Sequence, residues 1–360
     1  MRRRDVLLGI AGAAAAPRAA AAAAEGVYAR SLVIDSLTPQ DMGFDAAAAL
    51  AAGLTGSVLD MSFYPRDRSN ALEALAAWNA ELAANPKLLA VRGSADLDRA
   101  KAERRYGVIL ACQDAAILGV STFSVSDDNL DNLRQCHALG LRVLQLTHNE
   151  RNALGDSFRE PANAGLSLLG RAVVAEMNRL GTLVDLSHCG EATTLEAISR
   201  SSRPVAVTHA GCRTLRDTPR NKSDAVIRAL ADRGGYFGVF NVSNWLNTRP
   251  TASVDDLVDH VDYLVKLGGE DLPGFGSDAP VLGDPRSQAD KLASLAGYMA
   301  RNKDLPGGEP FTGHTSITAL DSPRRMQVIA DALSRRGYKD AAIEKVLGGN
   351  FARVFRAACG

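Results

Sequence analysis

The sequence predicts a single (β/α)8 TIM barrel over residues 25–360, an α/β fold in which parallel strands alternate with helices. Two observations lead to this prediction. Short β-rich hydrophobic runs recur from residue 31 onward, and helical stretches separate them, as in a parallel sheet whose crossover connections are helices. These runs number eight, which is enough to close a barrel. The predicted strands are 31–35, 54–62, 107–113, 140–147, 181–188, 203–209, 234–241 and 272–278.

Helical stretches fill the intervals between the predicted strands. Several begin with Ser or Asp, whose side chains accept hydrogen bonds from the free backbone N–H groups of a helix start. Segment 283–322 is rich in Gly, Pro and Ser, so we expect a long loop over the barrel mouth there, with one helix at 288–301. The other predicted helices are 69–84, 168–180, 191–199, 223–232, 253–267, 324–336 and 340–347.

A doubly wound open sheet is the alternative architecture for such a pattern. No Gly-x-Gly-x-x-Gly follows an early strand and no Walker-type loop occurs, so nucleotide binding is not expected. The chain carries 41 basic and 41 acidic side chains. This balance gives no indication of nucleic acid or an anionic membrane as a partner, and it favours a small neutral molecule as substrate.

The first 24 residues predict an export signal. Arg2-Arg3-Arg4 precedes a short apolar segment and an alanine-rich run, which is typical of a twin-arginine signal peptide. The segment is weakly hydrophobic, so removal near Ala24 is favoured over a permanent anchor. We therefore expect a periplasmic protein with no stable membrane span.

Five cysteines are scattered along the chain, and no Cys-x-x-Cys pair occurs. An oxidising compartment permits one or two disulfides, but the odd number and the spacing argue against a disulfide scaffold. We expect most of them to pack as small apolar side chains. They are Cys112, Cys136, Cys189, Cys212 and Cys359.

Two histidines end consecutive predicted strands. Val184-Asp185-Leu186-Ser187-His188 and Val205-Ala206-Val207-Thr208-His209 each finish a hydrophobic run with an imidazole. Because the carboxyl ends of parallel strands meet at one rim of a barrel, the two rings should lie close enough to share a metal ion. Asp278 ends a later strand at the same rim. A lone histidine at a strand end is more often a hydrogen-bonded rim residue, so it is the pairing that indicates a functional site.

Further motifs accompany the two histidine motifs: Leu146-Thr147-His148-Asn149, Glu176-Met177-Asn178-Arg179-Leu180-Gly181, Arg220-Asn221, Gly274-Phe275-Gly276-Ser277-Asp278 and Gly349-Asn350-Phe351-Ala352-Arg353-Val354-Phe355. Together they resemble the membrane (renal) dipeptidase family of zinc metallopeptidases over nearly all of residues 31–358. The resemblance implies a barrel of the metal-dependent-hydrolase type, in which two zinc ions hydrolyse dipeptides and related small amides. It also implies a role for each matching residue: zinc binding for His188 and His209, binding of substrate and transition state for His148, binding of the substrate carboxylate for Arg220, and catalytic proton transfer for Asp278.

The chain departs from the family pattern at three metal positions. Leu37 and Pro39 stand where the family has a His-x-Asp pair, and neither side chain binds a metal. Gln113 stands where the family has a bridging glutamate. If the alignment is shifted by one residue, Asp114 takes that position instead. Two divalent cations need an anionic bridge to lie close together and to lower the pKa of a shared water. We therefore expect at most one tightly bound zinc ion.

Three interpretations of the function remain open. The first is a dipeptidase-like hydrolase of small peptides or amides with a free carboxylate, with one zinc ion on His188 and His209 and with Asp278 or Asp114 as further ligands. The second is a metal-free tailoring enzyme, an isomerase or lyase acting on a peptide-derived metabolite, with His148 or His188 as general base and Asp278 as acid. The third is a non-catalytic binding protein. A homodimer is also left open.

Overall fold

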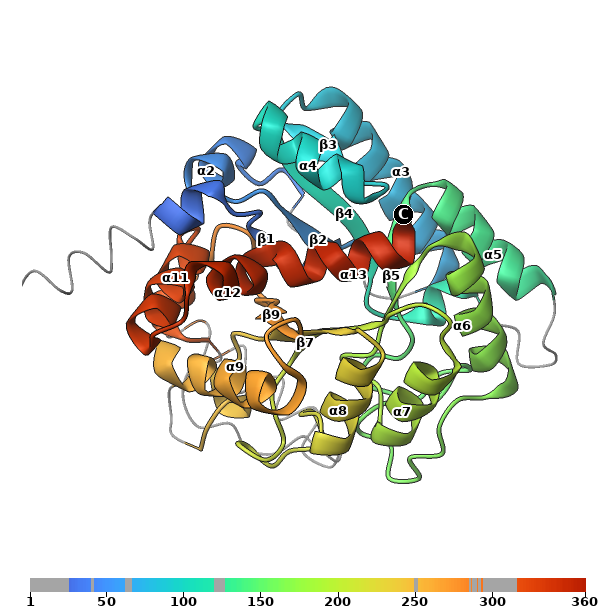
Figure 1. The fold of residues 1–360 in the computed structure, drawn as a ribbon. Helices are drawn as coiled ribbons and strands as arrows, with labels where there is room; N and C mark the ends of the chain where they lie inside the picture. Colours follow the sequence, from blue (N-terminus) through green and yellow to red (C-terminus); the bar gives the residue numbers. More distant parts are fainter. Residues whose placement is uncertain are drawn as a thin grey trace, which may run out of the picture.

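Figure 1 shows the fold of the chain in a computed structural model. The structure describes residues 26–39, 42–61, 67–119, 127–248, 252–284 and 316–360, together with residues 286, 290 and 293. The predicted export signal lies outside the described residues, as do most of the predicted mouth loop and its helix at 288–301. Within the described part of the chain, no helix is long and apolar enough to span a membrane.

Eight parallel strands form the predicted barrel. They pair in the order β1-β2-β4-β5-β6-β7-β8-β9. A hydrogen bond between the segments of β1 and β9 joins the two ends of the sheet. The amide of Asp278, just after β9, donates to the carbonyl of Leu37 in β1 at 3.0 Å. The strands are β1 (Ile34–Pro39), β2 (Gly56–Asp60), β4 (Tyr106–Cys112), β5 (Leu141–Gln145), β6 (Leu183–Asp185), β7 (Ala206–Ala210), β8 (Tyr236–Val239) and β9 (Pro273–Phe275).

The strands differ from the prediction in number and in several of their bounds. A short additional strand, β3 (Leu88–Ala90), pairs only with β4 and lies outside the ring. β6 ends at Asp185, three residues before the predicted end. The carboxylate of Asp185 accepts hydrogen bonds from the amides of Ser187 at 3.0 Å and Thr208 at 3.1 Å, and these amides are therefore diverted from the strand ladder. His188 consequently lies in a turn.

Helices surround the barrel, as Figure 1 shows. The predicted serine caps are confirmed at α8 and α9, where the hydroxyls of Ser223 and Ser253 accept from backbone amides in the first turn. Ser167 caps α6 in the same way, whereas α3 is capped by Asp67 and not by the predicted Ser69. The helices that we did not predict include α4 and α13. The helices are α2 (Ala46–Ala51), α3 (Arg68–Ala84), α4 (Ser94–Glu103), α5 (Asp127–Ala138), α6 (Leu168–Leu180), α7 (Glu191–Arg200), α8 (Asp224–Asp232), α9 (Val254–Gly268), α11 (Arg325–Arg336), α12 (Asp340–Glu344) and α13 (Asn350–Cys359).

Helix α13 closes the amino-terminal end of the barrel and crosses the centre of the view in Figure 1. The guanidinium of Arg353 donates to the carbonyls of Gly234 at 2.6 Å and Asp271 at 2.8 Å, which precede β8 and β9. Phe351 packs edge-on against Tyr236 of β8, with 5.4 Å between ring centroids. Because α13 fills this end with apolar side chains, the carboxyl-terminal end of the strands is the end available for a site.

All five cysteines are free thiols. Four of them are buried and Cys359 is half-buried, in keeping with the prediction that they serve mainly in packing.

Candidate active site at the carboxyl-terminal barrel end

The two predicted histidines meet at the carboxyl ends of β6 and β7. His188 follows β6 and His209 lies within β7, and both side chains are buried. Their Nε2 atoms lie 2.9 Å apart. The pairing of consecutive strand ends therefore brings the imidazoles together as the sequence predicted.

A chain of hydrogen bonds fixes the tautomer of His209. The hydroxyl of Thr208 donates to Asp185 at 2.6 Å, so this oxygen can only accept from Nδ1 of His209, which lies 2.9 Å away. Nδ1 therefore carries the proton, and Nε2 presents a lone pair. Burial, followed by the charge of Arg220, holds the pKa of His209 well below its usual range. The ring is accordingly neutral near pH 7, as a metal ligand or a proton acceptor must be.

His188 is held by residues of the segment that follows β5. Its Nδ1 lies 2.9 Å from Oδ1 of Asn149, which is an acceptor. The ring of His148 stacks on that of His188 with 4.4 Å between centroids, and Phe158 meets it edge-on at 5.8 Å. These contacts direct Nε2 of His188 toward His209. Asn149 was not identified from the sequence as a site residue, although it directly follows His148.

The histidine pair supplies two donors for one metal ion, and the described residues supply no second set of ligands. With both Nδ1 atoms protonated toward their partners, two Nε2 lone pairs face each other at 2.9 Å, an arrangement that needs a proton or a cation between them. Among the described residues, no group of three or more His, Cys, Asp and Glu side chains is placed to hold a metal ion. Asp278 and Asp114 are therefore not gathered with the histidines as the further ligands that we predicted.

Asp114 has a local structural role. Its carboxylate caps a short 3-10 helix (Ala115–Leu118) by accepting from the amide of Ala116 at 2.9 Å. It also accepts from Nδ2 of Asn152 at 2.8 Å.

Asp278 lies at the carboxyl end of β9, as predicted. Its backbone is in the left-handed region, with φ of 53°, a conformation that Asp tolerates better than most residues. The side chain is half-buried, and its charge raises the pKa of Arg220 against the opposing effect of burial. Asp278 and Arg220 therefore interact electrostatically across the barrel mouth.

Arg220 is buried between the two histidine segments, with 1% of its surface exposed. Its guanidinium donates to the carbonyls of Ser187 at 2.6 Å and His209 at 3.0 Å. Burial lowers its pKa to about 10, which leaves it charged near pH 7. Its Nε has no hydrogen-bond partner among the described residues. Three rings surround the guanidinium carbon at 5.3 to 5.8 Å from their centroids, those of Phe158, Phe240 and Trp245.

Lys222 is a second buried cation, which was not predicted from the sequence as a site residue. Its Nζ donates to the carbonyl of Cys189, the residue after His188, at 2.8 Å. Burial lowers the pKa of Lys222 to about 7. Arg220 and Lys222 thus bind the backbone on either side of His188. The sequence indicates this arrangement only by placing the two cations two positions apart in one short segment.

The three departures from the family pattern are built into the structure. Leu37 is buried in a hydrophobic cluster with Ile34 and Val58, and Pro39 ends β1. Nε2 of Gln113 donates to the carboxylate of Asp60 at 2.9 Å. Leu37, Pro39 and Gln113 therefore do not provide the metal ligands that the family has at these three positions.

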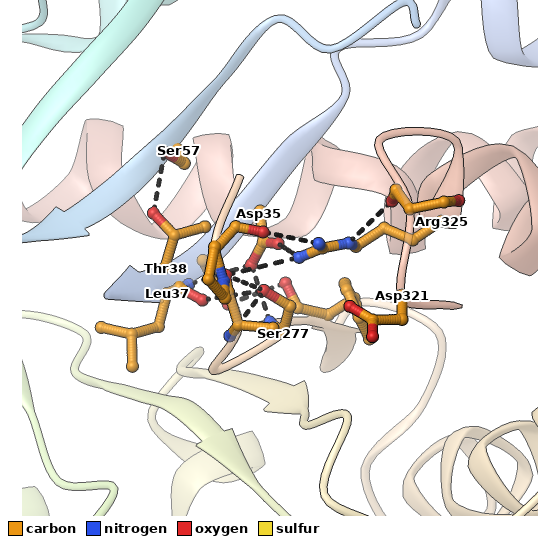
Figure 2. Close-up of polar contacts among 12 residues, drawn as sticks. Asp35, Leu37, Thr38, Ser57, Ser277, Asp321 and Arg325 are labelled. Atoms are coloured by element: carbon orange, nitrogen blue, oxygen red, sulfur yellow. Dashed lines mark hydrogen bonds and ion pairs between the residues drawn. The ribbon is translucent and has the colours of Figure 1, made fainter. Parts of the chain in front are cut away.

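A buried carboxylate and guanidinium, shown in Figure 2, take up the space beside β1. Asp35 accepts from the amide of Ser277 at 2.7 Å and lies 3.5 Å from Nη1 of Arg325. Arg325 also donates to the carbonyls of Ala279 at 3.4 Å and Pro280 at 2.6 Å. Arg325, at the start of α11, therefore joins the first strand to the loop after the last one, a long-range contact that the sequence did not reveal.

Comparisons with known proteins agree with this geometry. The family model described as membrane dipeptidase (peptidase family M19) matches residues 27–295. Dipeptidase verJ of Clonostachys rogersoniana is 27% identical over 242 residues, which are 67% of this chain and 54% of that protein. An uncharacterised dipeptidase of Schizosaccharomyces pombe is 34% identical over 170 residues, 46% of this chain and 41% of that one. The chain thus spans about half the length of these curated relatives.

Solved structures show the same barrel over almost the whole chain. An amidohydrolase from Pseudomonas aeruginosa superposes with a TM-score of 0.81 at 26% identity, covering 94% of this chain and 99% of that one. The probable dipeptidase PvdM from the same organism has a TM-score of 0.74 at 21% identity, covering 95% and 99%. With most of its length matched by the family model, the chain belongs to the membrane dipeptidase family, peptidase family M19.

Proposed function

We propose that the protein hydrolyses small peptides or amides that carry a free carboxylate, with at most one tightly bound zinc ion. The observation that carries this proposal is the pair of Nε2 atoms 2.9 Å apart beside a buried guanidinium. The pair supplies two imidazole donors for a metal ion, and the guanidinium supplies a fixed positive charge for an anion.

His188 and His209 would hold the metal ion, which supplies Lewis-acid activation of a water and of the scissile carbonyl. Asn149 and Thr208 fix the orientation of the two rings through hydrogen bonds to their Nδ1 atoms. Arg220 binds the substrate carboxylate through its unpartnered Nε edge and so orients the scissile bond. His148, stacked on His188, contacts the polarised carbonyl, and Asp278 transfers the proton to the leaving amine.

The test combines metal analysis with an activity assay on the full chain. We expect no more than one zinc ion per chain and release of amino acids from simple dipeptides, and removal of the metal by a chelator should abolish the release. Two zinc ions per chain at high occupancy would contradict the single-metal proposal. Tight dipeptide binding by the zinc-loaded protein without any release would indicate a binding protein instead.

Activity that survives exhaustive chelation would favour a third possibility, a metal-free tailoring enzyme. The histidine pair could then act as a proton relay, because His209 is neutral and presents a lone pair to His188.

A further inference from the structure

Two buried amide oxygens at the ends of β4 and β5 have no hydrogen-bond partner among the described residues. They are Oε1 of Gln113 and Oε1 of Gln145. Gln113 is 6% exposed and Gln145 is fully buried. A buried acceptor without a donor is unfavourable, and such groups in folded proteins usually meet a water, an ion or a ligand.

The partners of the two side-chain nitrogens fix which end of each amide remains available. Nε2 of Gln113 donates to the carboxylate of Asp60 at 2.9 Å. Nε2 of Gln145 donates to the carbonyls of Gln113 at 2.5 Å and Thr147 at 2.8 Å. Flipping either amide would place oxygen against oxygen. This side of the barrel mouth therefore offers acceptors.

On the other side of the mouth, three of the unpartnered groups are N–H donors. Among the described residues, no partner is present for Nε of Arg220, after β7, or for Nδ2 of Asn241 and Asn244, after β8. The orientation of Asn241 is also fixed, because its Oδ1 accepts from the amide of Ile317 at 2.9 Å. The histidines of β5, β6 and β7 lie between these two sides in the strand order.

We propose that Gln113 and Gln145 form a subsite for a free ammonium group of the substrate. The ligand then lies across the mouth with its ammonium at β4 and β5 and its carboxylate at β7 and β8. This inference rests on the proposed function, which supplies the carboxylate end. Gln113 then binds the substrate ammonium at the position where the family resemblance places a metal ligand.

An ammonium group fits the acceptor side for two physical reasons. It offers three N–H donors and accepts no hydrogen bonds, which matches a pair of acceptors. The carboxylate of Asp60, one hydrogen bond behind Gln113, adds a negative charge that attracts a cation. A neutral acyl group in the same place would leave both amide oxygens without donors.

Two ligands that differ only in the ammonium group provide the test. 5-Amino-4-oxopentanoate is glycylglycine with CH2 in place of the peptide N–H, so it cannot be hydrolysed at that bond, and 4-oxopentanoate lacks only its ammonium. We expect calorimetry on the full chain to show about tenfold tighter binding of the amino compound, the scale of a charge-assisted hydrogen bond. Equal affinities would overturn the ammonium subsite and leave the proposed function standing, whereas binding of neither ligand would contradict the proposed function itself.

Substitutions then assign the preference to the two glutamines. Gln113→Met and Gln145→Met should each remove most of the preference for the amino compound while leaving 4-oxopentanoate binding unchanged. Gln327→Met is the matched control, because Gln327 is a buried glutamine on α11 that bonds Asp331 instead. Equal weakening of both ligands in the two site variants would show that the glutamines only support the fold and would overturn the proposal.

Discussion

The hydroxyl of Thr208 links the carboxylate of Asp185 to Nδ1 of His209. The hydroxyl donates its one proton to Asp185, so its oxygen accepts a hydrogen bond from Nδ1 of His209. Nδ1 is therefore the protonated ring nitrogen. Thr208 thus sets the donor properties of His209, the residue that we propose as a zinc ligand.

Replacing Thr208 tests this relay. Thr208→Val removes the acceptor at Nδ1 while keeping the shape of the side chain, so His209 loses its tautomer preference. Zinc affinity, measured by competition with a chromophoric chelator, should fall by about 10-fold to 100-fold. Thr208→Ser keeps the hydroxyl and should bind zinc like the unaltered protein. Unchanged affinity in the valine variant would show that the tautomer is set elsewhere.

Arg220 should recognise the substrate carboxylate. Arg220→Met should weaken binding of 4-oxopentanoate by about 2 kcal/mol, the scale of a lost charge-assisted pair, and leave the corresponding primary amide almost unaffected. Because Arg220 also binds the carbonyls of Ser187 and His209, the variant will lose stability as well. The comparison of the two ligands by calorimetry separates these effects, since a disturbed fold weakens both.

The Asp35 and Arg325 pair should contribute strongly to stability. Arg325→Met leaves the buried carboxylate of Asp35 without its counter-charge and should cost about 3 kcal/mol in the free energy of unfolding. Asp35→Asn in the same chain should recover part of that loss. Urea denaturation of the two single variants and the double variant measures the coupling, and strictly additive losses would mean that the pair does not interact.

Glu176 should make the protein sensitive to acid. Hydrogen bonds from Arg179 and Arg134 lower its pKa to about 2, compared with about 4.3 for an unfolded glutamate. A lowered pKa in the folded state stabilises the protein above pH 4.3, and this contribution disappears as the pH falls toward 2. Both arginines are partly exposed, at 61% and 39%, so we expect only about 1 kcal/mol at pH 7.

Denaturation of Glu176→Gln at pH 7 and near pH 2.5 checks this prediction. The difference from the unaltered protein should be present at pH 7 and clearly smaller at the lower pH. Glu344→Gln is a suitable control, because Glu344 pairs with Arg30 at an exposed position and should show little difference at either pH. A constant difference for Glu176→Gln would exclude the ionisation as its cause.

The sequence predicted the eight barrel strands because each is a hydrophobic run that carries its own periodic signal. It also predicted the His188 and His209 pair, because consecutive parallel strands end at one rim. β3 was missed because it is a short strand outside the ring, in the interval between two barrel strands where the alternating pattern predicts helix. The roles of Lys222, Arg325 and the two glutamines could not be predicted, since they depend on contacts between segments that are distant in the chain.

Closure of the barrel by α13 has a consequence for how the chain folds during synthesis. Several of the side chains that pack with α13, including those of Ile34, Val58 and Ile109, belong to the first half of the chain, whereas Phe351 and Phe355 are translated more than 200 residues later. A ribosome-bound chain therefore carries an open apolar barrel end until residues 350–359 leave the exit tunnel. Truncation before α13 should therefore yield a product that chaperones retain.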